Sequence, residues 1–123
     1  MLPPRLTAEL KELENVYQID VIEEDASVDL VIRNFPTSSH FNRTQTTLLI
    51  RIPRSYPDAG PDMFWTDVDL LLTDNTVPKN GDLIEAYCGK QWRRFSWHHN
   101  GWNPAVNNLG TYITFVQRRF ADK

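Results

Sequence analysis

The stretch "TTLLIRIPRSYPDAGPDMFW", residues 46–65, decides the fold class. Within its first seven residues, Leu48, Ile50 and Ile52 fall on one side and Thr47 and Arg51 on the other, which is the period of a β-strand with one face on a core. Pro57 and Pro61 stand on either side of a glycine and predict a turn. Residues 63–65 are apolar again and predict a short further strand. The stretch therefore predicts two strands of an antiparallel sheet that has one buried face.

Two earlier segments predict further strands of the same sheet. Residues 19–23 and 28–33 alternate in the same way, and the connections beside them are short and polar. In the second segment, Leu30 falls on the buried side and Asp29 falls on the side expected to face solvent. Together with the stretch above, these segments predict a meander of four antiparallel strands.

Helices are predicted at both ends of the chain. Apolar residues recur at i, i+4, i+7 and i+11 in residues 6–17 and again in residues 109–120, which is one face of a helix. Residues 66–105 show little periodicity, and irregular stretches of that length inside a compact domain are often functional. The order predicts a single α+β domain, residues 1–123, whose four-stranded antiparallel meander is packed by an N-terminal and a C-terminal helix.

Composition narrows the class of function. The chain of 123 residues has a formal net charge of −3, which does not favour binding to nucleic acid. One cysteine excludes an internal disulfide and leaves a cysteine-based metal site without a second thiolate. We therefore expect neither a metal nor a cofactor. The first residues lack an apolar signal core and no apolar stretch is long enough to span a membrane, so we expect a cytoplasmic protein without membrane contact.

The densest chemistry lies in "AYCGKQWRRFSWHHNGWNP", residues 86–104, which holds the only cysteine, Cys88, and two of the three histidines, His98 and His99. Cys88 has two interpretations: a small buried hydrophobic residue, or a nucleophile that acts as its thiolate. Lys90 and the two arginines that follow it would lower the pKa of the thiol if they faced it. His98 is either a structural histidine or a proton acceptor near the thiol.

The order of these elements resembles that of the ubiquitin-conjugating enzymes over nearly the whole chain. "RLTAELKELENV", residues 5–16, is similar to the family's first helix, and "IRIPRSYPDAGPDMFW", residues 50–65, is similar to its third strand, tyrosine-proline turn and fourth strand. "WNPAVNNLGTYITFVQRRF", residues 102–120, resembles the tryptophan-x-proline entry into the helix after the active site. Cys88 lies between the last two matches, where the family keeps its thioester-forming cysteine.

The chain also departs from the usual pattern of that family. No histidine-proline-asparagine signature precedes Cys88, and the chain ends before the family's last two helices. These features resemble a bacterial branch, the ubiquitin-conjugating-like proteins encoded beside activating-enzyme-like and isopeptidase-like proteins. In that branch a serine-x-histidine and a tryptophan-rich stretch follow the cysteine, and Ser96, His98 and Trp102 match this pattern here.

The resemblance implies a conjugating enzyme that accepts the C-terminus of a ubiquitin-like protein as a thioester on Cys88 and transfers it to an amine of a target protein. It also implies an activating-enzyme-like partner and a place in a bacterial antiviral defence operon. His98, His99 or Asn100 would supply the proton acceptor or the oxyanion donor. Two alternatives stay open: a non-catalytic module of the same fold that docks the ubiquitin-like protein or its activating enzyme, and a small cysteine hydrolase that uses Cys88 and His98.

Overall fold

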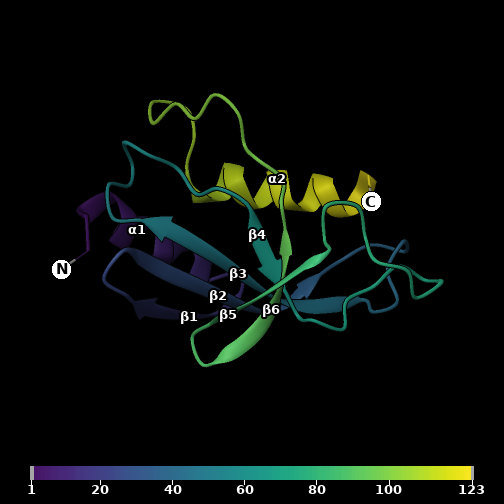
Figure 1. Ribbon diagram of the computed structural model, residues 1–123. Helices are drawn as coiled ribbons and strands as arrows, with labels where there is room; N and C mark the ends of the chain where they lie inside the picture. The colour runs from purple at the N-terminus through teal and green to yellow at the C-terminus, as the bar shows by residue number, and fades with distance from the viewer. Residues whose placement is uncertain (1, 123) are drawn as a thin grey trace.

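Two helices, one near each end of the chain, lie on one side of a six-stranded antiparallel sheet (Figure 1). The computed structural model describes residues 2–122. The elements are α1 (Pro4–Glu14), β1 (Gln18–Glu23), β2 (Ser27–Pro36), β3 (Gln45–Pro53), β4 (Phe64–Thr66), β5 (Leu83–Tyr87), β6 (Lys90–Phe95) and α2 (Leu109–Asp122). The strand order in the sheet is β1-β2-β3-β4-β6-β5. Neither helix in this part of the chain is long and apolar enough to cross a membrane.

The main core lies between the helices and the sheet. Alternate side chains of β2 and β3 enter this core, and Leu30 and Ile50, for example, are fully buried there. One face of α1 adds Leu6 and Leu10 to the same core. The predicted α+β class, the antiparallel sheet and the two packing helices are therefore confirmed.

Phe120 of α2 lies at the centre of an aromatic cluster in this core. Its ring centroid lies 5.3 to 6.1 Å from those of Phe35, Phe41, Phe64 and Phe95. These separations are in the range where aromatic rings attract one another. The four partner rings come from β2, the following loop, β4 and β6, so a single helical side chain joins distant parts of the chain.

The predicted number of strands is wrong, because β5 and β6 lie in the segment that the sequence predicts to be irregular. Their sequences, "LIEAY" and "KQWRRF", show no clear apolar alternation. The physical reason is that β6 divides its two large apolar side chains between two cores: Phe95 enters the main core and Trp92 enters a second one. The polar residues between them bind backbone and side-chain partners instead of following a simple period.

The second core lies on the sheet face that the helices leave open, where the β5–β6 hairpin crosses β2 and β3. Val31, Leu49, Trp65 and Trp92 form this buried cluster. The indole N–H of Trp92 donates a hydrogen bond of 2.9 Å to the carbonyl of Tyr87, which fixes the ring within the hairpin. As a result, the first six residues of β2 are all buried, although only alternate ones were expected to be.

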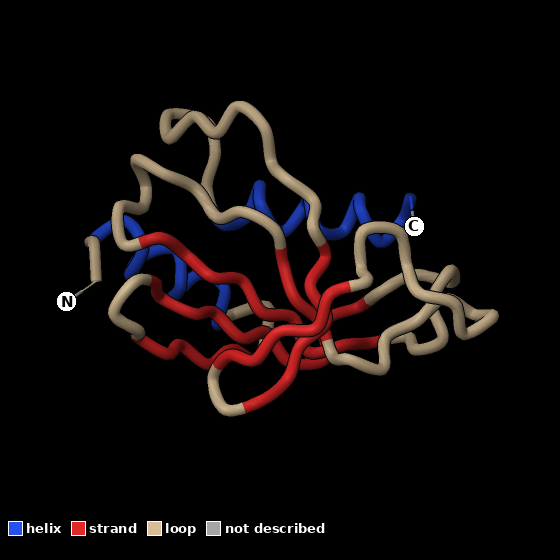
Figure 2. Tube along the Cα trace, in the orientation of Figure 1, coloured by secondary structure: helices blue, strands red, loops and turns tan. Residues whose placement is uncertain are grey.

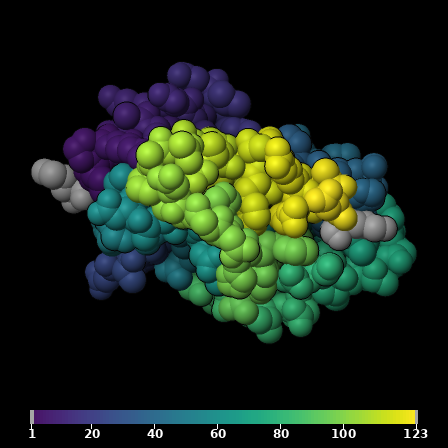
Figure 3. All heavy atoms as spheres, turned by 90° about the horizontal axis from the view of Figure 1, so that it is seen from above, coloured from purple at the N-terminus to yellow at the C-terminus, as the bar shows by residue number. Residues whose placement is uncertain are grey.

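The longer loops gather at the two ends of the sheet (Figure 2). At one end, loop 54–63 lies beside loop 96–108, and Trp102 Nε1 donates a hydrogen bond of 2.8 Å to the carbonyl of Pro57. Viewed from above, the end of loop 96–108 and the start of α2 lie beside α1 (Figure 3). At the other end, loop 37–44 contacts loop 67–82 through an isolated bridge of Phe41 with Leu72 and an ion pair of Arg43 with Asp69.

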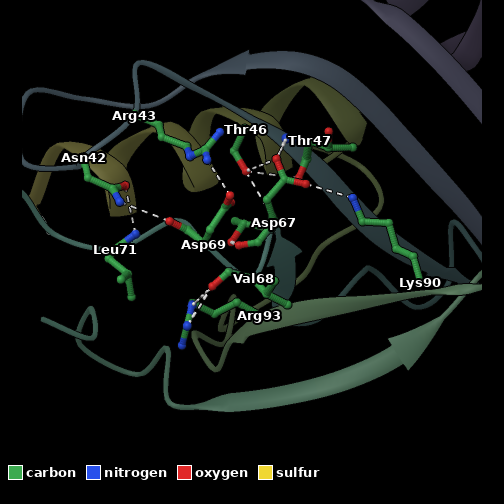
Figure 4. Close-up of polar contacts among 11 residues, drawn as sticks. Asn42, Arg43, Thr46, Thr47, Asp67, Val68, Asp69, Leu71, Lys90 and Arg93 are labelled. Carbon is green, nitrogen blue, oxygen red and sulfur yellow. Dashed lines mark hydrogen bonds and ion pairs between the residues drawn. The ribbon is translucent and has the colours of Figure 1, made fainter. Parts of the chain in front are cut away.

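Asp67, directly after β4, joins three segments at that second end (Figure 4). Its carboxylate accepts a 2.9 Å hydrogen bond from the backbone N–H of Thr47 on β3 and a 2.8 Å hydrogen bond from Lys90 Nζ on β6. Burial alone would raise the pKa of Asp67, but the hydrogen bonds from Lys90 and Thr47 outweigh it and hold the pKa below its ordinary value. The ammonium of Lys90 is therefore bound to Asp67.

Replacing Phe120 by alanine tests the aromatic cluster. We expect Phe120→Ala to lower the free energy of unfolding by about 3–5 kcal/mol, because it removes a buried ring and leaves a cavity. Urea unfolding followed by circular dichroism measures this change. Val106→Ala is the control: Val106 is 67% exposed, so its loss should change stability by less than about 0.5 kcal/mol. Equal effects of the two substitutions would contradict the central position of Phe120.

Candidate functional site

Cys88 lies in the two-residue turn that joins β5 to β6. Tyr87 pairs with Lys90 across the turn, and Cys88 and Gly89 have φ angles of 52° and 75°. Positive φ is uncommon for a residue that carries a side chain, whereas glycine adopts it freely. A Cβ placed on Gly89 would meet no atom within 4 Å. The turn is therefore open on this side.

Cys88 is half-buried and borders a groove of about 280 Å³. Lys90 and Trp92 of the hairpin also line this groove, together with residues of β1 and β2 that include Asp20 and Arg33. The groove lies on the sheet face away from the helices. The sulfur is therefore not enclosed among the tryptophan rings, and a reactant in the groove would lie beside it.

The thiol donates a hydrogen bond to a buried carboxylate on β2. Cys88 Sγ lies 3.2 Å from Asp29 Oδ2. The other oxygen of Asp29 accepts hydrogen bonds from Ser27 Oγ, at 2.7 Å, and from Arg51 Nε, at 3.1 Å. Arg51 in turn lies over the ring of Tyr87, 3.9 Å from its centroid. The carboxylate is thus fixed on one side by an ion pair and turned to the sulfur on the other.

The surroundings of Cys88 favour its protonated form. Its pKa is raised to about 11, first by burial and then by the hydrogen bond to Asp29 and the negative charge of that residue. The charge of Glu24 acts in the same direction, whereas Arg51 opposes it. Nearly all of the thiol is therefore protonated at neutral pH, and a reaction at this sulfur must remove the proton.

The basic residues near Cys88 in sequence bind other partners, so the condition under which they would lower the pKa of the thiol is not met. Lys90 is bound to Asp67. Arg93 donates to the carbonyls of Val68 and Gly81, and Arg94 forms an ion pair with Glu85. Each of these side chains is therefore held by a partner other than the thiol: Asp67 for Lys90, two loop carbonyls for Arg93 and Glu85 for Arg94.

The structure does not bring the sequence-predicted His98, His99 and Asn100 to the thiol. β6 lies between them and Cys88, and its six residues span about 17 Å at about 3.3 Å per residue. Figure 2 shows the hairpin turn and loop 96–108 on opposite sides of the sheet. The Cys88–His98 pairing that a cysteine hydrolase would need is therefore not formed.

Each of these three residues has its own surroundings in loop 96–108. His98 is exposed, and its Nδ1 lies 2.8 and 3.0 Å from the two carboxylate oxygens of Asp62. The ring of His99 packs against those of Trp102, Tyr112 and Phe115. Asn100 is exposed at the start of a bend. These contacts connect the loop to α2 and to loop 54–63.

A protein family described as "Prokaryotic E2 family E" matches residues 2–123, nearly the whole chain. The chain belongs to this prokaryotic E2 family. No curated protein and no solved structure matches it. An E2 is a ubiquitin-conjugating protein, so the predicted resemblance to the bacterial ubiquitin-conjugating-like proteins is confirmed. Membership indicates a role in the conjugation of a ubiquitin-like protein.

In this prokaryotic E2, sequence reasoning missed Asp29. The alternation of β2 placed its side chain on the solvent face, yet it is fully buried because the β5–β6 hairpin covers that face. The available signal was indirect. Trp92 and Tyr87 are large side chains in a polar segment, and such residues need an apolar surface to pack on.

One cluster in the described part of this E2 has metal-ligating side chains close together. Ligand atoms of Glu24, Asp29 and Cys88 all lie within 4.8 Å of one another. Asp29, however, is already bound to Arg51 and Ser27. A cation would have to compete with the guanidinium for the buried carboxylate, so this cluster supports no metal site.

The raised pKa of Cys88 predicts an unusual dependence of alkylation on pH. Because iodoacetamide reacts with the thiolate, we expect the rate to keep rising to about pH 11 in the folded protein. In urea, the alkylation rate of the same cysteine should level off at pH values just above its ordinary pKa of about 8.5. Mass spectrometry measures both rates, and circular dichroism confirms folding at each pH. Identical profiles in the two conditions would show that the turn does not perturb the thiol.

Proposed function

We propose that this prokaryotic E2 carries a ubiquitin-like protein as a thioester on Cys88 and transfers it to an amine of a target protein. Family membership supports a role in such conjugation. The observation that carries the finer proposal is the position of the sulfur. It belongs to the only cysteine of the chain, stands in an open turn, borders a groove and contacts a proton acceptor.

The proposed reaction has two acyl-transfer steps. In loading, Cys88 Sγ loses its proton and attacks the carbonyl of a thioester on an activating enzyme; a new C–S bond forms, the old one breaks, and the released thiolate takes up a proton. In discharge, a neutral amine attacks the carbonyl, a C–N bond forms and the C–S bond breaks; the nitrogen loses a proton, and the departing thiolate of Cys88 takes one up. A thiolate of high pKa leaves slowly. The thioester on Cys88 should therefore persist until a suitable amine is bound.

The proposal implies three protein partners: the ubiquitin-like protein, an activating-enzyme-like protein and the target. It places the chain in the bacterial cytoplasm, in a conjugation system of the antiviral kind that its sequence resembles. The groove beside Cys88 has a volume of about 280 Å³, and the C-terminus of the ubiquitin-like protein would occupy it to reach the sulfur.

A docking module is the second candidate. Two observations favour it: the raised pKa of Cys88, and the absence of any contact between its thiol and His98, His99 or Asn100. In this role the protein would bind the ubiquitin-like protein or its activating enzyme without forming a covalent bond. Loop 96–108, which exposes His98 and Asn100, would then be a recognition surface.

Reconstitution separates the two candidates. The protein is incubated with ATP and with the activating-enzyme-like and ubiquitin-like proteins of the same genome. We expect an adduct with the mass of the ubiquitin-like protein that disappears on treatment with a thiol reductant and does not form in Cys88→Ala. Cys88→Ser should instead form an adduct that resists the reductant. Binding without any adduct would support the docking module and contradict transfer at Cys88.

His98→Ala tests whether loop 96–108 takes part in the chemistry. Because β6 separates His98 from the thiol, we expect loading and discharge rates within about twofold of the wild type, or less than about 0.5 kcal/mol in activation free energy. Single-turnover gel assays measure both steps, with His40→Ala as the matched control. A selective loss of discharge would support the sequence-based hypothesis that His98 acts on the incoming amine.

A further inference from the structure

Asp29 is a buried carboxylate in direct contact with the candidate nucleophile. Its side chain is 1% exposed, and Asp29 Oδ2 accepts the hydrogen bond of the Cys88 thiol at 3.2 Å. Carboxylates are rarely buried without a cationic partner, and Arg51 provides that partner. This ion pair accounts for the burial of Asp29 but not for the direction of its second oxygen, which points to the sulfur.

We infer that Asp29 is a catalytic residue, the general base that accepts the proton of Cys88 during loading. The inference rests on the proposed function and adds a residue that the sequence does not indicate. Arg51 and Ser27 hold Asp29 Oδ1, so Asp29 Oδ2 is left to face the thiol. A base must lie within hydrogen-bond reach of the proton it takes, and this geometry is already present in the free protein.

The proton and the electrons balance within the loading step. The S–H bond of Cys88 breaks as its proton passes to Asp29 Oδ2, and the sulfur electron pair forms the new bond to the thioester carbonyl. When the tetrahedral intermediate collapses, the C–S bond to the donor breaks. The departing thiolate then takes up the proton from Asp29, which restores the carboxylate. No oxidant, metal or further reactant is needed.

The charges around the pair explain why proton transfer accompanies attack. A thiolate formed in advance would lie between the carboxylates of Asp29 and Glu24, with only Arg51 to offset them. Lys90, the nearest cation in sequence, is bound to Asp67. The free thiol therefore remains protonated, and the proton leaves only when the forming bond draws charge from the sulfur. Such a thiol resists alkylation and oxidation, which act on the thiolate.

Asp29→Asn tests whether Asp29 is a base or only a structural residue. If it is a base, the substitution changes the alkylation rate and the acyl-transfer rate of Cys88 in opposite directions. Without the neighbouring charge, we expect alkylation of Cys88 by iodoacetamide at pH 8 to be several-fold faster. Acyl transfer from a synthetic peptide thioester of mercaptoethanesulfonate should be at least about tenfold slower, because the base is lost. Both rates are measured by mass spectrometry on the intact protein.

Asp69→Asn is the matched control. Asp69 also pairs with an arginine, Arg43, but it lies outside the lining of the groove beside Cys88. We expect neither rate to change by more than about twofold. If Asp29→Asn changes both rates in the same direction, Asp29 only shapes the turn and the inference is wrong. Circular dichroism checks that both variants fold.

A second measurement avoids substitution altogether. If Asp29 takes the proton as the C–S bond forms, acyl transfer to the wild-type protein is slower in D₂O than in H₂O at matched positions on the pH profile. Equal rates would indicate attack by a thiolate formed in advance and would overturn the inference. These tests use a peptide thioester, so they stand apart from the reconstitution. If these tests show a general base at Cys88 but the reconstitution shows no loading from an activating enzyme, the proposed function is wrong and the inference about Asp29 stands.

Discussion

The β5–β6 hairpin covers the sheet face that the helices leave open, and the rest of the candidate site depends on this contact. Trp92 is 2% exposed and anchors the hairpin over Val31 and Leu49. When Trp92 is packed in this cluster, the turn at the tip of the hairpin places Cys88 over β2. Asp29 is withdrawn from water by the same step. A single apolar contact thus creates both the position of the sulfur and the low-dielectric surroundings that raise its pKa.

The ion pair of Asp29 with Arg51 makes that burial tolerable. A carboxylate without a partner in such a place would take up a proton or destabilise the fold. The guanidinium compensates the charge, and the ring of Tyr87 covers the guanidinium. The arrangement is ordered from the sheet outward: β3 supplies Arg51, β2 supplies Asp29, and the hairpin adds the sulfur last. The geometry at Cys88 is therefore coupled to the docking of a strand pair on the sheet face away from the helices.

Much of the fold was predictable, and the reason is that its strongest signals are local. The helical period of residues 6–17 and the alternation in residues 46–52 each reflect one element that packs on one core. β5 and β6 gave no such signal, because Trp92 and Phe95 face different cores. The same two-sided packing explains why the prediction for Asp29 was wrong. The alternation of its neighbours in β2 indicated that its side chain faces solvent. A pattern within one strand cannot indicate which other segment will cover it.

Cys88 occupies a backbone position that does not suit it. A two-residue hairpin turn with positive φ at both central positions is usually built from asparagine and glycine; Gly89 follows this preference and Cys88 does not. Holding a side chain in the left-handed region costs about 1 kcal/mol. Random drift would favour asparagine here, which would stiffen the hairpin and remove the sulfur. If related chains keep a thiol at this corner, its persistence there would measure selection for chemistry, in opposition to selection for stability.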